Sequence, residues 1–437
     1  MALSNYLILI NRTAKLVGFV LLRCAHRAVQ VVVWSFNGTN RKISDSQKPN
    51  NYERCVQVLD VVLFYAFDSM VCTSRSNFIC RHNRFEDPRY IFDNDHVTLI
   101  TLDDKYAIFG EARRKGMQLW KMDFSAFMKL AQLEYCDRLL LVPLDHFHRM
   151  AEELGDPRSE IVFLFNVGRC GSTFMTQLME NTGQCVSISE PGPLFVVLQK
   201  QQEQTADRDN LSRLCRDSIR WICRPCTSYK PLVYFVKVAP SCTPILPIVS
   251  DVFPHSKYLF MYRNVRDVAQ SFYTVLQELP FMFLMSSLAR LSSTLRRKFL
   301  TQFGMWQLFE KEGAVWDDMV LGTVGFIKVC EIYLEFRNKG FPISAVRYED
   351  TVSDPLNSTK RIFNYCGLPD SLVERSLEGL VLDSQRNSPL SMARLKKHKR
   401  GEYTLESKRF SNQLLTQFNF PLIGEECLLE GTITSSK

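Results

Sequence analysis

The sequence predicts an α/β protein in which a parallel sheet is flanked by helices and is preceded by an N-terminal α+β region. From residue 159 on, short apolar runs typical of buried strands alternate with helical patterns, and this alternation indicates a parallel sheet with crossover helices. Before that point, hairpin and helix patterns follow a different order, and Gly155, Asp156 and Pro157 form a natural boundary. We therefore expect two domains, residues 1–158 and 159–425.

The elements are expected in the following order. Residues 96–110 read as a hairpin, and residues 123–135 and 145–154 read as helices with Asp123 and Asp145 as N-caps and Gly155 as a stop. Buried strands are then expected at residues 161–165, 186–189, 232–238, 257–262 and 342–347, with helices at 265–276 and 316–338. The carboxyl ends of these strands are where such sheets bind their ligands.

The composition is that of a globular protein. Of the 437 residues, 46% are hydrophobic and 23% are charged, and the formal net charge is +8. This charge suits an anionic small ligand. No basic stretch is interleaved with aromatic residues as a nucleic-acid groove requires, and the densest basic run, residues 394–400, is typical of a solvated loop. We expect no nucleic-acid partner.

The fourteen cysteines lack the spacing of a disulfide framework. Cys223 and Cys226 form a single CxxC without a second pair at zinc-like spacing, so no metal is expected. Cys330 and Cys366 lie inside apolar runs, which indicates reduced thiols in a reducing compartment. Cytoplasmic localisation is the expectation, with Golgi association as the alternative.

The first residues of the chain contain two apolar runs, "YLILI" and "LVGFVLL". Asn11, Arg12 and Lys15 separate them, so the stretch falls short of the ~18–20 uninterrupted apolar residues that a membrane span needs. We expect no transmembrane segment here. An amphipathic helix that rests on a membrane or on the body of the protein remains open.

The stretch "IVFLFNVGRCGSTF" has the pattern of an anion-binding loop. A buried strand leads into a loop from Gly168 to Thr173, and a helix opens directly after it. This arrangement aims backbone N–H groups and a helix N-terminus at a phosphate. A nucleotide-hydrolysing P-loop would place a lysine before the hydroxyl residue, but here Gly171 is followed directly by Ser172, and Arg169 is the strong cation. An ATPase or kinase is therefore disfavoured.

A second stretch, "KYLFMYRNVRDVAQSFY", predicts another phosphate contact. A buried strand ends at Arg263, and Ser271 follows on the next helix. An arginine and a hydroxyl placed in this way can converge on one phosphate. A third stretch, "RYEDTVSDP…IFNYCGLP", indicates a further strand–helix unit. Two phosphate-binding strand ends in one sheet suggest a ligand with two separated phosphates.

Together these three stretches resemble the sulfotransferase family, over roughly residues 161–390. The resemblance implies a P-loop-like fold and 3′-phosphoadenosine 5′-phosphosulfate (PAPS) as donor, without a metal. It assigns the 5′-phosphosulfate loop to Arg169, Cys170, Gly171, Ser172, Thr173 and Phe174, and it assigns further nucleotide contacts to Arg263, Ser271 and Tyr348. Arg169 would stabilise charge on the departing oxygen.

The sequence departs from the cytosolic branch of the family, which has a catalytic histidine where "FVKVAPSCTP" has none. Carbohydrate-type and some bacterial members look similar to "SISEPGPLF", which places Glu190 in the role of the base. Lys237 would be a second cation on the transferring group. The expected activity is sulfuryl transfer to a hydroxyl or amine of a carbohydrate or small molecule. The alternatives are a non-catalytic nucleotide-binding or interaction protein and, with less support, a P-loop kinase or NTPase.

Overall fold

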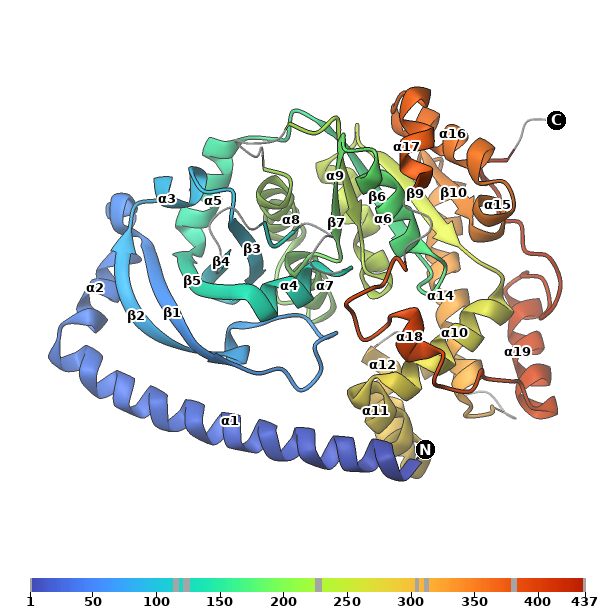
Figure 1. Ribbon diagram of the computed structural model, residues 1–437, viewed down its shortest axis with the longest axis horizontal. Coiled ribbons are helices and arrows are strands. Elements are labelled where there is room, and N and C mark those ends of the chain that lie inside the picture. The colour runs from blue at the N-terminus through green and yellow to red at the C-terminus, as the bar shows by residue number, and fades with distance from the viewer. Residues whose placement is uncertain are drawn as a thin grey trace. The chain divides into compact units, whose positions relative to one another are not determined.

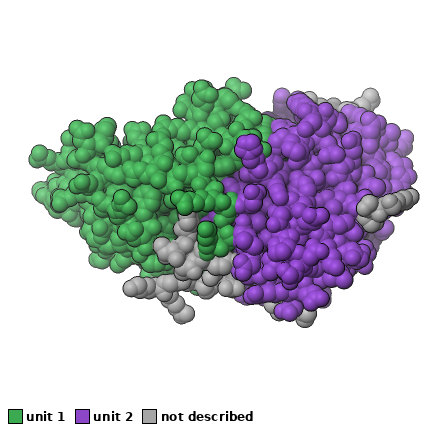
Figure 2. All heavy atoms as spheres, turned by 90° about the horizontal axis from the view of Figure 1, so that it is seen from above, with its two compact units in different colours: residues 1–159, 190–231, 245–254 green, residues 160–189, 232–244, 255–437 purple. Residues whose placement is uncertain are grey.

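The computed structural model describes residues 2–112, 118–120, 126–224, 230–302, 306–309, 314–378 and 383–434. The chain forms two compact units whose segments alternate along the sequence, shown in green and purple in Figure 2. The first unit comprises residues 1–159, 190–231 and 245–254, and the second comprises residues 160–189, 232–244 and 255–437. The division into domains at residue 158 stays a prediction.

The first unit is built on an antiparallel sheet of five strands. In sheet order these are β2 (Phe78–Glu86), β1 (Val56–Phe64), β5 (Cys136–Pro143), β4 (Tyr106–Ala112) and β3 (Val97–Leu102). The predicted hairpin is confirmed as β3 and β4, with the tight turn at Asp103, whose side chain accepts hydrogen bonds from the backbone N–H groups of Lys105 and Tyr106 at 2.9 and 2.8 Å.

Along the sequence, the helices of the first unit come before, between and after these strands. They are α1 (Ala2–Phe36), α2 (Thr39–Ser46), α3 (Arg89–Phe92), α4 (Met128–Tyr135), α5 (Leu144–Leu154), α7 (Gly192–Gln202), α8 (Arg208–Ile222) and α9 (Leu246–Val252). The prediction of Asp145 as an N-cap is wrong, because α5 begins at Leu144 after Pro143 and Asp145 lies in its first turn. Gly155 ends α5 as predicted, and Asp123 lies outside the described residues.

The helix α1 is continuous over 35 residues. Arginine and lysine are good helix formers, so Arg12 and Lys15 do not interrupt it. Tyr6–Phe36 is long and apolar enough to cross a membrane by length and composition. The expectation of no transmembrane segment counted only uninterrupted apolar residues, and that criterion does not detect this helix.

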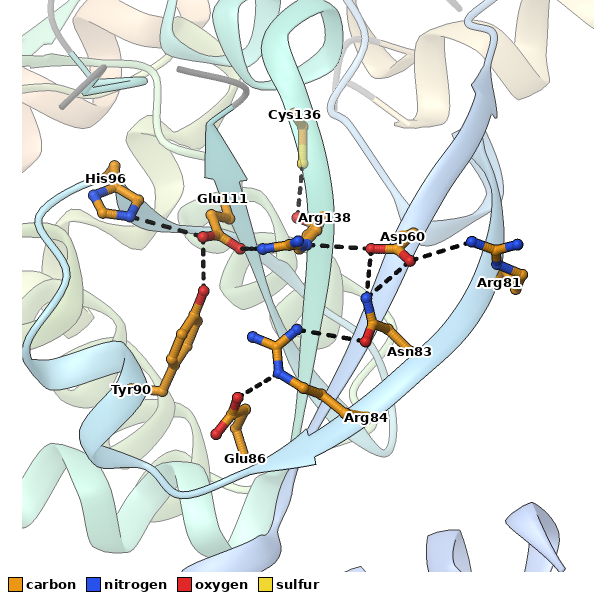
Figure 3. Close-up of polar contacts among 10 residues, drawn as sticks. All are labelled: Asp60, Arg81, Asn83, Arg84, Glu86, Tyr90, His96, Glu111, Cys136 and Arg138. Atoms are coloured by element: carbon orange, nitrogen blue, oxygen red, sulfur yellow. Dashed lines mark hydrogen bonds and ion pairs between the residues drawn. The ribbon is translucent and has the colours of Figure 1, made fainter. Parts of the chain in front are cut away.

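A polar network joins three strands of the antiparallel sheet (Figure 3). The Arg138 guanidinium on β5 lies between Asp60 on β1 and Glu111 on β4, donating hydrogen bonds of 3.2 and 3.3 Å. The hydroxyl of Tyr90 donates to the same Glu111 carboxylate at 2.7 Å. Each charge in this network is matched by an opposite charge or a hydrogen-bond donor, which is typical of a structural network.

The second unit is built on a parallel sheet of five strands (Figure 1). In sheet order these are β10 (Ile343–Arg347), β9 (Lys257–Tyr262), β6 (Glu160–Asn166), β8 (Val233–Lys237) and β7 (Cys185–Ser189). All five predicted strands are confirmed to within a residue at each end. Their side chains are almost all buried, and this is why they read as continuous apolar runs.

Helices flank this parallel sheet. They are α6 (Ser172–Asn181), α10 (Val265–Glu278), α11 (Pro280–Leu291), α12 (Ser293–Gln302), α13 (Trp306–Phe309), α14 (Asp318–Asn338), α15 (Tyr348–Ser353), α16 (Pro355–Cys366), α17 (Val373–Glu378), α18 (Met392–Leu395) and α19 (Leu405–Gln417). The rings of Phe260 on β9 and Tyr333 on α14 stack at 4.4 Å. The predicted α/β class, with its parallel sheet and its N-terminal α+β region, is confirmed.

Candidate active site

The loop after β6 is organised by Asn166, the polar residue that ends this apolar strand. Its side-chain amide donates to the carbonyl of Val238 at 2.8 Å. Its oxygen accepts from the backbone N–H of Gly168 at 3.0 Å and from the hydroxyl of Ser172 at 3.2 Å. Since Asn166 is 1% exposed, these bonds are shielded from water and fix the loop between the strand and α6.

The N-terminus of α6 is open to an anion. Its N-cap is Gly171, at φ 88°, and no side chain in the described part of the chain caps it. A Cβ at this position would lie 2.3 Å from the ring of Tyr348, the first residue of α15. Glycine is therefore required both by the backbone and by the close approach of Tyr348.

Arg263 lies against the other side of this contact. Its guanidinium sits 4.6 Å from the centroid of the Tyr348 ring, and it forms an ion pair of 3.4 Å with Asp267. Its Nε–H is buried and has no hydrogen-bond acceptor among the described residues. The same holds for the Nε–H groups of Arg216, Arg337 and Arg361, so this donor is available to a ligand but does not by itself indicate one.

Arg169 and Ser271, predicted to contact two different phosphates, lie in direct contact. The Arg169 Nε–H donates to the Ser271 hydroxyl at 2.9 Å, and a terminal N–H donates to the side-chain oxygen of Gln385 at 3.3 Å. The guanidinium therefore has a fixed orientation, held from α10 and from the loop that contains Gln385.

Lys237 is brought to the same loop from the end of β8. Its ammonium is 2% exposed and donates to the hydroxyls of Thr173 at 3.0 Å and Ser189 at 3.5 Å. Gln385 also reaches Thr173, at 3.4 Å. Lys237 thus contacts the first turn of α6 directly, and Gln385 links that turn to Arg169, although the chain lacks the lysine of an NTPase loop.

The remaining predicted residues of this loop are Ser172, Phe174 and Cys170. Ser172 turns its hydroxyl toward Asn166, and Phe174 is half-buried in the first turn of α6. Cys170 is fully buried, and burial raises the pKa of its thiol to about 11. The thiol is therefore neutral and unreactive at physiological pH, and its part in the loop is to fill space.

Glu190, the predicted base, directly follows β7 and is classed with the first unit by its contacts. Its carboxylate forms an ion pair of 3.0 Å with Lys129 on α4, and the side chains are 11% and 5% exposed. Burial favours the neutral amine of Lys129, but the facing carboxylate outweighs this and the pKa of Lys129 is raised. The pair is therefore charged on both sides at neutral pH.

Arg169 and Glu190 share an uncommon backbone conformation. Both have φ of 54°, in the left-handed region, and only three other described non-glycine residues have positive φ. Such strain persists only where the surrounding contacts hold it, and it gathers at functional sites. Two of the three predicted catalytic residues thus share this conformation with Gln204, Asn387 and Asn419, and their catalytic roles stay predictions.

Within the described residues, no group of three or more His, Cys, Asp or Glu side chains could hold a metal ion. Cys223 is buried, and Cys226 lies outside the described residues. Cys330 and Cys366 are free and fully buried, as expected of core thiols.

Three residues of this region were not predicted from the sequence. Asn166 is signalled by an amide at the end of an apolar strand, and Lys129 by a charge directly after the apolar run Ala126–Met128. Gln385 lies in a loop far along the chain, and no local pattern marks it. All nine predicted nucleotide and loop residues lie in the second unit, and the functional roles assigned to them stay predictions.

Comparison with known proteins identifies the family to which this protein belongs. Residues 160–416 match the model of the sulfotransferase domain, which is more than half of the chain, and the protein belongs to the sulfotransferase family. The predicted resemblance is confirmed. No curated protein matches.

The solved structures that match this chain share little sequence with it. Sulfotransferase STF9 from Mycobacterium avium is 13% identical, with a TM-score of 0.38, covering 64% of this chain and 81% of its own. Mouse sulfotransferase SULT7A1, complexed with PAP, is 16% identical, with a TM-score of 0.36 and coverage of 62% and 89%. The sulfotransferase from Alicyclobacillus acidocaldarius is 14% identical, with a TM-score of 0.32 and coverage of 60% and 93%.

Proposed function

We propose that this protein transfers a sulfuryl group from PAPS to a hydroxyl or amine of a carbohydrate or small molecule. The observation that carries the proposal is the set of cations at the uncapped N-terminus of α6. Arg169 lies in the loop before it, Lys237 contacts its first turn, and Arg263 lies behind Tyr348. Three cations around one open helix end fit a ligand with more than one anionic group.

The residues present fit such a donor. A phosphate at the N-terminus of α6 would accept hydrogen bonds from backbone N–H groups, since no side chain among the described residues caps this helix. A second phosphate oxygen would satisfy the buried Nε–H of Arg263. Leaving such a donor unmatched costs ~1–3 kcal/mol, so binding a bisphosphate there recovers that energy.

For sulfuryl transfer, the protein has to position the reactants and balance the charge that develops. The bond from sulfur to the donor's phosphate oxygen breaks, the bond from sulfur to the acceptor atom forms, and the acceptor's proton moves to a base. Arg169 and Lys237 would balance the negative charge that develops on the departing oxygen. Glu190, which forms an ion pair with Lys129, would take the proton.

Transfer from labelled PAPS to a broad panel of acceptors tests the proposal. Arg169→Ala should lower turnover by ~10²–10³-fold and change bisphosphate affinity much less, because the charge matters most as the leaving oxygen becomes negative. Arg169→Lys is the matched control, since it keeps the charge and loses only the planar fork.

A wild-type turnover rate in Arg169→Ala would remove this residue from the reaction. If the wild-type protein binds the bisphosphate and transfers to no acceptor, the non-catalytic alternative replaces the proposal.

A further inference from the structure

A half-polar stripe of α1 faces the first unit. One stripe of the helix, with helical spacing, is buried or half-buried: Leu9, Arg12, Leu16, Phe19, Arg23, His26, Gln30 and Trp34. Arg12 donates to the carbonyl of Phe67 at 2.8 Å, and Gln30 donates to the carbonyl of Cys80 at 2.8 Å. Figure 1 shows α1 running beside β1 and β2. The helix is thus attached to the first unit through both polar and apolar groups.

The apolar side of α1 faces outward. Its exposed large apolar residues include Leu7, Ile10, Val17, Leu21, Leu22, Val29, Val31, Val32, Val33 and Phe36, all between 48% and 88% exposed. A surface helix of a soluble domain has the opposite arrangement, with its apolar stripe inward. A row of this kind along a helix about 50 Å long exceeds the apolar patches that monomeric proteins normally leave in water.

The neighbouring end of β1 is also apolar and exposed. Val62, Leu63 and Phe64, at the end of β1, are 61%, 41% and 37% exposed. The next residue, Tyr65, packs on Phe19 of α1 at 5.8 Å and donates to the carbonyl of Arg12. These contacts hold the inward stripe of α1 on the end of β1.

The charges on this segment indicate what covers it. The first 44 residues contain Arg12, Lys15, Arg23, Arg27, Arg41 and Lys42 and no acidic residue. Lys15 and Arg27 are exposed and lie at the margins of the inward stripe. Long basic side chains at the margin of an apolar helix face are placed to reach anionic headgroups. A second copy of the helix would bring these like charges together.

A spanning arrangement fits less well. Every stretch of 20 residues within α1 contains at least two arginines or lysines. Such residues cost ~2.5–3.5 kcal/mol each at the centre of a bilayer, and a span would also break the bond from Arg12 to Phe67.

We propose that α1 lies in the plane of an anionic lipid surface, with its outward apolar face in the acyl boundary and Lys15 and Arg27 among the headgroups. The half-polar stripe stays on the first unit, which is thereby held against the membrane. This arrangement does not depend on the proposed transfer activity.

Flotation of the full-length protein with vesicles tests the proposal. Binding should require phosphatidylserine mixed with phosphatidylcholine. Leu21→Glu and Val32→Glu should each weaken it by ~10–100-fold, the effect of a leucine-sized apolar side chain. Leu405→Glu is the matched control: Leu405 lies on α19, is 91% exposed, and its replacement should change nothing. Lys15→Gln and Arg27→Gln should each reduce the preference for anionic vesicles by ~5-fold.

Depth measurements distinguish an in-plane helix from a span. Nitroxide labels at Ile10→Cys, Leu21→Cys and Val32→Cys, in a Cys24→Ser background, should all report the same shallow depth. A label at Leu21 far deeper than the other two would indicate a span and overturn the proposal. Three other results would also overturn the proposal. The first is a failure of the protein to bind vesicles, and the second is vesicle binding that Leu21→Glu leaves unchanged. The third is a lipid-free dimer, detected by light scattering, that Leu21→Glu dissociates.

Discussion

Gly171 and Tyr348 determine how closely the loop from Gly168 to Thr173 approaches the strand–helix segment β10–α15. The contact is too tight for any side chain at position 171, since even a Cβ would overlap the Tyr348 ring. The Tyr348 ring also contacts the Arg263 guanidinium, so these three residues pack together.

Gly171→Ala should therefore destabilise the protein and weaken binding of 3′,5′-adenosine bisphosphate. We expect a loss of ~1–3 kcal/mol from overpacking, beyond the strain of the left-handed backbone. Gly340→Ala is the matched control, since Gly340 has φ of 80° but open space around its Cα. Denaturant unfolding of both variants measures the difference, and equal losses would contradict the packing argument.

The Lys129–Glu190 pair links stability to the proposed base. Glu190→Gln would leave the buried Lys129 ammonium without this carboxylate, and Lys129→Met would leave the carboxylate without this ammonium. Each should cost ~3–5 kcal/mol, and the double variant, which removes both charges, should recover most of it. Sulfuryl transfer should still be lower by ~10²–10⁴-fold in the double variant, because the base is absent. Wild-type transfer in that variant would make the pair purely structural.

The same pair gives a pH dependence with a definite sign. The pKa of Lys129 is raised above its ordinary 10.5 in the folded protein. The stabilisation from the pair is therefore complete below pH 10.5 and is lost as the pH rises through the folded-state pKa. The difference in unfolding free energy between wild type and the double variant should be constant from neutral pH up to that point and shrink above it.

At the scale of elements, the junction of β6 and α6 depends on Asn166. Asn166→Leu removes three hydrogen bonds and leaves buried groups of the loop unmatched, at ~1–3 kcal/mol for each such group. Affinity for the bisphosphate should decrease together with the stability of the protein, since the loop after β6 loses the hydrogen bonds that hold it. Asn181→Leu, at the other end of α6, is the control and removes one bond of 3.2 Å to Ser376. Calorimetry that finds the two variants equally competent in binding would exclude this role for Asn166.

The parallel sheet could be predicted because its strands are buried on both faces and read as unbroken apolar runs. The same signal is weak in the antiparallel sheet, where β2 alternates buried and exposed residues with several charges. The terminus of α5 was predicted from Gly155, whereas its start was not, because Pro143 and Leu144 are not typical capping residues.

In the site, the sequence could indicate residues that follow strand ends, such as Arg169, Lys237 and Arg263. It could not indicate that Arg169 contacts Ser271 directly, or that Gln385 holds both Arg169 and Thr173. These contacts join segments far apart in the sequence, and no local periodicity encodes them.

At the scale of the whole molecule, the chain returns to the first unit twice after entering the second. Helix α8 belongs to the first unit, where Trp221 packs on Phe92 and Phe109 at 5.2 and 5.1 Å. Residues that the family model assigns to the sulfotransferase domain therefore complete the core of the first unit. Measurements of the site accordingly need the full chain.

Calorimetry on the full-length protein tests the central claim, that the second unit binds a nucleotide with separate 3′ and 5′ phosphates. The wild type should bind 3′,5′-adenosine bisphosphate far more tightly than AMP or ATP. Arg263→Ala should remove ~1.5–3 kcal/mol of that preference, the value of a charged hydrogen bond. Arg266→Ala, which removes an exposed arginine from the same turn, should leave the preference intact. Equal affinity of the wild type for AMP and the bisphosphate would contradict the account.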